Sequence, residues 1–275
     1  MRFNGALRRL VPPYRMSVGR WRKLRHAALV LVCQLALVTL LLSLWEVSTA
    51  SDALRFLFGS PSAIWGFLVK MWGDGSLFRD TYVTGLETLL GFVLGNLIGT
   101  LCGLGLWYSR FLSLVMQPFV IAIGAIPIIA LAPIVIIWFG TGIASKVAMA
   151  TLSVVVVAFL TSYKGAASVG QDQINLMRSL HATKHQIFRK LVVPASLTDI
   201  FAGLKMTVGF ALIGAIIGEF MSSSEGLGHA IFRAGSLYII PKVFAALVAT
   251  IVLALVLSYL VGKLEQVLLP WRQDL

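Results

Sequence analysis

Six apolar runs, each about 20 residues or longer, constrain the fold of this chain more than any other feature of its sequence. They lie at 27–46, 83–107, 113–138, 144–162, 197–219 and 243–262. A helix of about 20 predominantly apolar residues crosses the hydrocarbon core of a membrane. Only 12% of the residues are charged, about half the fraction typical of a soluble domain. The runs therefore predict an all-α integral membrane protein with six transmembrane helices.

The distribution of Lys and Arg predicts the orientation of these spans. Of the 23 Lys and Arg residues, sixteen lie in segments on the N-terminal side of the membrane, six lie in the opposite segments, and Lys205 lies within the fifth run. Positive residues are enriched on the cytoplasmic side, so both termini are predicted to be cytoplasmic. We expect a basic N-terminal tail at 1–26, a six-span domain at 27–270 and a C-terminal tail at 271–275.

Two other interpretations, a signal peptide and a nucleic-acid-binding protein, fit part of this sequence. The small residues of "STASDA" after the first run would fit a signal peptide, but the 26 residues before the run favour a retained anchor. The net charge of +12 would fit a nucleic-acid-binding protein, but the basic residues alternate with apolar runs, as topology signals do. The segment 61–71 is too short to span and is expected to form an outer amphipathic helix.

The sequence lacks the motifs of several enzyme and cofactor classes. No G-x-x-x-x-G-K-[ST] motif occurs, so the chain itself is not expected to bind ATP. No H-E-x-x-H motif occurs, and Cys33 and Cys102 both lie within apolar runs. His181 and His185 are four residues apart, but a turn is predicted between them. We therefore expect no enzyme activity, no metal and no other cofactor.

The longest inner segment, 163–196, has the pattern of two short helices joined by a turn. The first helix carries Ile174, Met177 and Leu180 at three-residue spacing. His181-Ala182 interrupts this pattern. The segment is predicted to be a cytoplasmic docking element for another protein, and the alternative is a solvated connector between two spans.

The second helix of this segment has its own start and stop signals. Thr183 and Gln186 form a capping-box pattern, and Pro194 is expected to end the helix. Ser196 and Asp199 repeat the capping pattern at the start of the fifth span. The helix presents three apolar side chains to an apolar partner: Ile187, Phe188 and Leu191.

Three separated segments resemble those of binding-protein-dependent ABC transporter permeases, in the nitrate/sulfonate/taurine branch. "LMRSLHATKHQIFRKLVVPASLTDIFAGLK" (176–205) is similar to the EAA loop, and 126–142 and 217–231 resemble flanking segments of that branch. The resemblance implies a type I ABC importer permease-like bundle whose loop docks on the ATP-binding subunit. The docking residues so assigned are Asn175, Met177, Arg178, Leu180, His181, Ala182, Thr183, Ile187 and Phe188.

The loop departs from the family pattern at two places. Asn175-Leu176-Met177 holds the Glu-Ala-Ala position, and His181 holds the glycine position. A glycine at such a corner usually supplies a positive φ, which His adopts at some cost. The departures affect the geometry expected for the turn, and docking itself is still expected.

Several residues within the spans are candidates for the transport route. A carboxylate in a span normally faces the bundle interior or water, and prolines break helices where a cavity satisfies the freed backbone groups. For Glu87 a pathway role and an outer-interface role are both open, and Lys205 is expected to be structural. Gly91, Gly95, Gly99 and Gly103 form a stripe for close helix packing, against a helix that the sequence does not identify. The pathway residues predicted are Glu87, Asn96, Pro127, Pro133 and Glu219, with 124–133 as a wall.

These features predict the permease subunit of an ATP-driven importer in a bacterial inner membrane, surrounded by lipid and working as a homodimer. The resemblance implies an ATP-binding partner, a periplasmic solute-binding protein and a small anion such as a sulfonate, taurine or nitrate, or a pyrimidine or thiamine precursor. The alternatives are an ion-coupled carrier without an ATPase and an integral-membrane enzyme. The carrier would require internal repeats and paired intramembrane charges.

Overall fold

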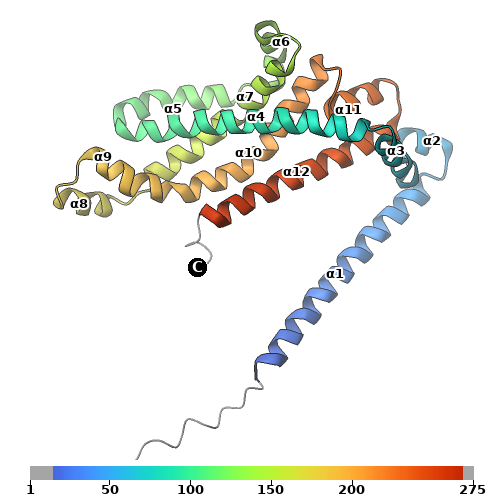
Figure 1. Ribbon diagram of the computed structural model, residues 1–275, viewed down its shortest axis with the longest axis horizontal. Coiled ribbons are helices and arrows are strands. Elements are labelled where there is room, and N and C mark those ends of the chain that lie inside the picture. Colours follow the sequence, from blue (N-terminus) through green and yellow to red (C-terminus); the bar gives the residue numbers. More distant parts are fainter. Residues whose placement is uncertain (1–14, 269–275) are drawn as a thin grey trace, which may run out of the picture. The chain divides into compact units, whose positions relative to one another are not determined.

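The computed structural model describes residues 15–268, so 1–14 and 269–275, including the predicted C-terminal tail, lie outside the described residues. Every regular element within 15–268 is helical (Figure 1). The elements are α1 (Arg15–Ser48), α2 (Asp52–Phe58), α3 (Pro61–Gly73), α4 (Ser76–Gly105), η1 (Leu106–Tyr108), α5 (Arg110–Gly124), α6 (Ile128–Phe139), α7 (Ile143–Ala167), α8 (Gln171–Ser179), α9 (Lys184–Ile187), η2 (Phe188–Val192), α10 (Val193–Ser222), α11 (Leu227–Ser236) and α12 (Ile240–Leu268). The chain divides into two units after Ser62, and each is described by itself.

The first unit contains α1, α2 and the start of α3. The apolar part of α1, Ala28–Ser48, is 21 residues long and could cross a membrane, which agrees with the first predicted span. Ser51 caps α2 by accepting the N–H of Leu54. The Glu46 carboxylate accepts the backbone N–H of Ser62 at 2.9 Å and its hydroxyl at 2.7 Å. These bonds fix the start of α3, the predicted short helix, to the end of α1.

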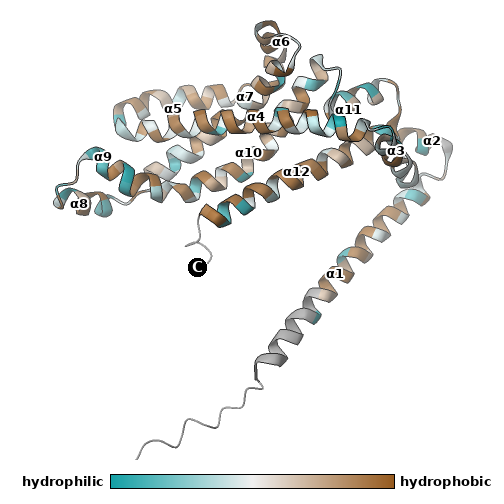
Figure 2. Cartoon of the chain, in the orientation of Figure 1, coloured by the Kyte–Doolittle hydropathy of each residue, from teal (hydrophilic) through white to brown (hydrophobic). Residues whose placement is uncertain are grey.

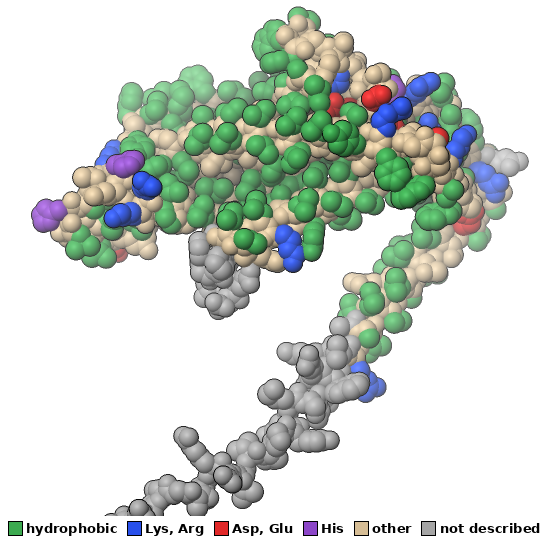
Figure 3. All heavy atoms as spheres, viewed as in Figure 1, with side chains coloured by type: hydrophobic (Ala, Val, Ile, Leu, Met, Phe, Trp, Pro, Cys, Tyr) green, Lys and Arg blue, Asp and Glu red, His purple; other side chains and the backbone are tan. Residues whose placement is uncertain are grey.

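The second unit is built on four long helices that pack side by side: α4, α7, α10 and α12 (Figure 1). Helix α7 contacts α4 and α10 along its length. Hydrophobic residues predominate along the middle of these helices, and hydrophilic residues are frequent on α8 and α9 (Figure 2). Lys, Arg and His side chains gather at the α8–α9 end and at the α11 end (Figure 3). This distribution is that of a bundle whose central band lies in a membrane.

The glycine stripe of α4 packs against α7 of the same chain. A Cβ added at Gly91 would lie 2.2 Å from the Cβ of Ala150, and one at Gly95 would lie 2.7 Å from the Cβ of Val154. A Cβ at Gly99 would lie 2.4 Å from a backbone oxygen of α7. The stripe therefore allows the two backbones to approach more closely than any larger residue would permit.

The third predicted span, 113–138, is not one straight helix. Among the described residues five helices are long and apolar enough to cross a membrane, and a sixth crossing requires α5 and α6 together, which meet at 92°. The break falls at Pro127, which has no N–H to continue α5 and starts α6 instead. Pro118 and Pro133 lie inside α5 and α6 without ending them. The predicted third span, disturbed by prolines, thus corresponds to this bent pair of helices.

Candidate functional site

The inner loop between α7 and α10 begins with α8, which ends in a Schellman motif. The Ala182 N–H donates to the Met177 carbonyl at 3.0 Å, and the His181 N–H donates to the Arg178 carbonyl at 2.9 Å. His181 has a φ of +56°, the left-handed conformation that this motif requires. The turn lies at 181–182 as predicted, and His181 adopts the positive φ of the glycine that it replaces.

Helix α9 begins with the predicted capping box. The Thr183 hydroxyl accepts the Gln186 N–H at 3.3 Å, and the Gln186 side chain accepts the Thr183 N–H at 2.8 Å. Pro194, however, does not end this helix, because α9 continues through the π turn η2 into α10. In a regular α-helix the ring of Pro194 would clash with the carbonyl of Lys190, four residues earlier. The π turn widens the helix at this point, and the Val193 N–H donates to the carbonyl of Phe188, five residues earlier. Ser196 is not a cap either, since its hydroxyl donates to the Val193 carbonyl.

The predicted docking residues divide into two groups. Four of them belong to an apolar cluster inside the subunit, whose buried residues are Leu104, Ala166, Ile187 and Val192. Ile187 is part of this cluster, and Met177, Ala182 and Phe188 pack against it. The other five are exposed: Asn175, Arg178, Leu180, His181 and Thr183. The expected apolar partner of Ile187 and Phe188 is therefore this chain's own core, which holds the loop firmly against α4 and α7.

One exposed apolar residue of the loop was missed by the sequence analysis. Leu176 is 62% exposed and Leu180 is 69% exposed, and the two lie four residues apart on one face near the end of α8. Their spacing could have identified this face, but the three-residue pattern drew attention to Ile174 and Met177, which pack inward. The two leucines therefore form a small exposed apolar patch on a mostly polar helix.

A buried polar cluster lies at the opposite end of the second unit, where α11 begins. The N–H of Gly226 donates to Asp80 at 3.2 Å, and the N–H of Leu227 donates to the Thr84 hydroxyl at 2.8 Å. The N–H of Gly228 donates to the Glu219 carboxylate, which also accepts the Thr84 hydroxyl at 2.6 Å. The first N–H groups of a helix have no partner within it. Side chains of α4 and α10 therefore cap α11 from outside.

The glycines of the segment "EGLG" make this cap possible. Gly226 has a φ of +106°, and a Cβ there would lie 2.3 Å from a Glu219 oxygen. A Cβ at Gly228 would lie 2.6 Å from the other Glu219 oxygen. The motif is thus explained by the close approach of a buried carboxylate to backbone amides.

Glu87 and Lys146 complete this cluster. Both are only 2% exposed, and the Lys146 ammonium lies within electrostatic reach of the Glu87 and Glu219 carboxylates. Lys146 also donates to the carbonyl of Ser222 at 2.8 Å and to that of Thr141. The group joins α4, α7 and α10 at one depth.

The predicted pathway residues fall into two environments. Glu87, Asn96 and Glu219 are buried within the subunit, and Asn96 accepts the Thr207 hydroxyl of α10 at 3.1 Å. Pro127 and Pro133 are exposed, at and beyond the α5–α6 break. The structure does not bring the five residues together, and their assignment to the pathway stays a prediction.

Lys205 forms an ion pair with Glu265, which joins α10 to α12. Lys205 is about half exposed, whereas Glu265 is largely buried. The pair gives Lys205 a definite structural partner, which the sequence could not identify. Within residues 15–268, no group of three His, Cys, Asp or Glu side chains could hold a metal ion.

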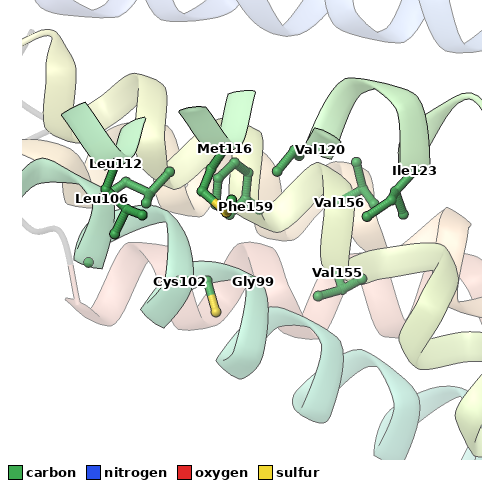
Figure 4. Close-up of a pocket in the computed structure, with 11 residues that line it drawn as sticks. Gly99, Cys102, Leu106, Leu112, Met116, Val120, Ile123, Val155, Val156 and Phe159 are labelled. Atoms are coloured by element: carbon green, nitrogen blue, oxygen red, sulfur yellow. The ribbon is translucent and has the colours of Figure 1, made fainter. Parts of the chain in front are cut away.

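A cavity of about 560 Å³ lies between α4, α5 and α7 (Figure 4). Its eleven lining residues are aliphatic, aromatic, sulfur-containing or glycine, and include Cys102, Met116 and Phe159. A charged solute would lose its hydration there without gaining a polar partner. The cavity is therefore unsuitable as a site for an anion.

The sequence pattern described as "Binding-protein-dependent transport system inner membrane component" matches residues 95–269, which is more than half of the chain. The chain belongs to this family. The permease is 34% identical to a probable ABC transporter permease protein of Haemophilus influenzae, over 82% of this chain and 91% of that protein. It is 32% identical to the formylaminopyrimidine transport permease protein ThiX of Halalkalibacterium halodurans, over 85% and 93%. It is also 29% identical to the putative aliphatic sulfonates transport permease protein SsuC of Bacillus subtilis, over 73% of each chain.

The fold of the permease is that of a type I ABC importer permease. A chain of the MetNI methionine ABC transporter, in an inward-facing conformation, matches it with a TM-score of 0.64 and 19% identity, over 72% of this chain and 97% of that one. The permease is thus a multi-pass protein of the bacterial inner membrane and the membrane subunit of an ABC importer. Membership of the family implies two kinds of partner, an ATP-binding subunit and a substrate-binding protein.

Proposed function

We propose that the permease docks its ATP-binding subunit through the exposed face of α8 and the turn that follows it. One observation supports this most directly: Leu176 and Leu180 are exposed on a loop whose other apolar side chains pack inward. Asn175, Arg178 and His181, which lie near these leucines in the sequence, are exposed as well. The four inward-facing docking residues, Met177, Ala182, Ile187 and Phe188, would act by holding this surface in place.

The experiment is co-purification of the permease with its ATP-binding subunit. Burial of a Leu side chain contributes about 1.5–3 kcal/mol, and a buried unpaired charge costs more. Leu180→Asp should therefore weaken the complex about tenfold or more. Gln171→Asp places the same charge at an exposed position on the opposite face of α8, five and nine residues before the two leucines, and serves as the control. Equal affinities for the wild type and for both variants would exclude this surface.

We further propose that the permease acts as a homodimer, with a periplasmic substrate-binding protein at its outer face. Within residues 15–268 one subunit contains at most six spans, and its long helices expose apolar side chains. The α5–α6 break, with Pro127 and Pro133 exposed, would face the pathway between two subunits. Glu87, Asn96 and Glu219 would then support the wall from behind. Like other membrane components of such importers, the permease would have no catalytic activity of its own.

The substrate is proposed to be a small polar organic molecule or anion. Relatives are named for formylaminopyrimidine, riboflavin, aliphatic sulfonates and taurine. The apolar cavity is not suited to any charged member of this group. An uptake assay with the substrate-binding protein, across these compounds and nitrate, would identify the substrate.

The ion-coupled carrier is less well supported. Paired charges within the spans, which we expected of a carrier, do occur at Lys146 and at Lys205. Both sets join helices of one subunit and have backbone or carboxylate partners, so a structural role accounts for them. Family membership favours the ATP-driven importer.

A further inference from the structure

The inner end of α4 is bonded directly to the start of α9. Helix α4 passes into η1, which ends at Tyr108. The Lys184 ammonium donates to the Tyr108 carbonyl at 2.6 Å and lies 5.8 Å from the centre of its ring. The Tyr108 hydroxyl lies 3.3 Å from Nδ1 of His185. A cation at the carboxyl end of a helix is favourable, and so is a cation over an aromatic ring.

Aromatic packing reinforces these polar contacts. The ring of Phe188 lies 4.7 Å from that of Tyr108 and 5.6 Å from that of Trp107. Trp107 and Phe188 both pack on the apolar cluster that includes Leu104 and Ile187. We call the group of Trp107, Tyr108, Lys184, His185 and Phe188 the inner latch. It combines a charged hydrogen bond with aromatic contacts of the kind that each contribute beyond simple burial.

The position of the inner latch in the chain gives it a mechanical role. Its first loop residue, Lys184, comes two residues after Ala182, which lies at the turn of the docking surface. On its other side the inner latch is followed at once by α5, whose first turn is capped by Ser109. Helix α5 leads to the break before α6. A displacement of the docking turn would therefore reach both α4 and α5 through the inner latch.

We propose that the inner latch keeps the docking turn, the end of α4 and the start of α5 together as one moving body, with Tyr108 as the positioning residue. The proposal rests on the proposed function of the loop. It assigns to η1 a part in transport that is separate from partner binding, because Tyr108 lies outside the loop segment that carries Leu176 and Leu180. Loss of the inner latch would leave docking and ATP hydrolysis intact and would weaken their link to substrate movement.

The test uses the full complex, with the ATP-binding subunit and the substrate-binding protein, reconstituted in lipid vesicles. Tyr108→Ala and Lys184→Met should each lower the substrate transported per ATP hydrolysed, by about tenfold for Tyr108→Ala. Binding of the ATP-binding subunit and the thermal midpoint of the permease should stay near wild type. Lys190→Met is the matched control, since Lys190 is an exposed lysine of the same loop outside the inner latch.

A covalent bridge distinguishes a coupling role from a structural one. The two native cysteines are first replaced, by Cys33→Ser and Cys102→Ser. Tyr108→Cys and His185→Cys then remove the contacts of the inner latch, and a short bismaleimide joins the two new cysteines covalently. The proposal expects poor coupling before cross-linking and recovered coupling after it. Normal coupling before cross-linking, or no recovery after it, would overturn the proposal. If the wild-type permease fails to bind the ATP-binding subunit at all, the proposed docking function fails instead.

Discussion

His181 has a left-handed backbone, with a φ of +56°, at the turn that follows α8. The strain of this conformation for an L-residue with a Cβ is about 1–2 kcal/mol. The Schellman hydrogen bonds of Ala182 and His181 hold it in place. The side chain of His181 is exposed, so the effect of this residue on the stability of the loop comes mainly from its backbone conformation.

His181→Gly should therefore stabilise the loop by about 1 kcal/mol, and His181→Val should destabilise it by a similar amount. The reason is the free-energy cost of a positive φ, which is absent for glycine and largest for a β-branched residue. Amide hydrogen exchange of 176–186 measures the change locally. Slower exchange in the valine variant than in the wild type would contradict this account.

Gly228, in the buried polar cluster at the start of α11, has no room for a side chain. A methyl group there would lie 2.6 Å from a Glu219 oxygen and 3.0 Å from the Ile216 carbonyl oxygen. Gly228→Ala should lower the free energy of unfolding by about 1–3 kcal/mol. Gly209→Ala is the control, because nothing lies within 4 Å of the added methyl group and alanine favours a helix. Thermal unfolding in detergent compares the two, and equal midpoints would mean that the cap is not tight.

At the scale of elements, the apolar runs predicted six spans, of which five are long helices and the third is the bent pair of α5 and α6. The start and stop signals predicted the two helices of the inner loop. The signals failed where the effect of a residue depends on its neighbours in space. Pro194 and Pro127 are chemically the same, yet one lies in the first turn of a continuing helix and the other separates two helices. The sequence could not show that η2 would widen the turn before Pro194.

The contact between α4 and α7 depends on the glycine stripe. Gly95→Leu should separate the two helices and destabilise the permease by about 1–3 kcal/mol or more, because the added atoms overlap Val154. Gly105→Leu makes the same change on α4 where nothing lies within 4 Å of the added Cβ, so it should be tolerated. Thermal stability and the yield of folded permease measure both effects. Similar yields for both variants would show that α4 and α7 can separate without loss.

For the whole molecule, family and fold were predictable because three motifs keep their order along the chain. The buried clusters were not predictable, because they join residues far apart in sequence. Thr84 and Glu219 are 135 positions apart, and no pattern within a single span indicates their contact. A carboxylate in a span was correctly recognised as unusual, but its partner was not identifiable from the sequence.

The orientation of the whole molecule remains a prediction from charge, sixteen inner Lys and Arg residues against six outer ones. In a chain without Cys33 and Cys102, a cysteine at 185 should react with an impermeant maleimide only from the cytoplasmic side. A cysteine at 225 should react only from the periplasmic side. Labelling of both from the same side would reverse or invalidate the arrangement, and with it the docking proposal.

The capping of α11 has a consequence for the synthesis of the protein. Asp80 and its partner Gly226 are 146 residues apart, so at about 5–20 residues per second Asp80 is synthesised roughly 7–30 s before Gly226. During that interval the polar groups of α4 have no backbone partner from α11. They must remain in contact with water or with the insertion machinery until almost the whole chain has been made. Helix α4 can therefore reach its final depth in the membrane only after translation of the last outer segment.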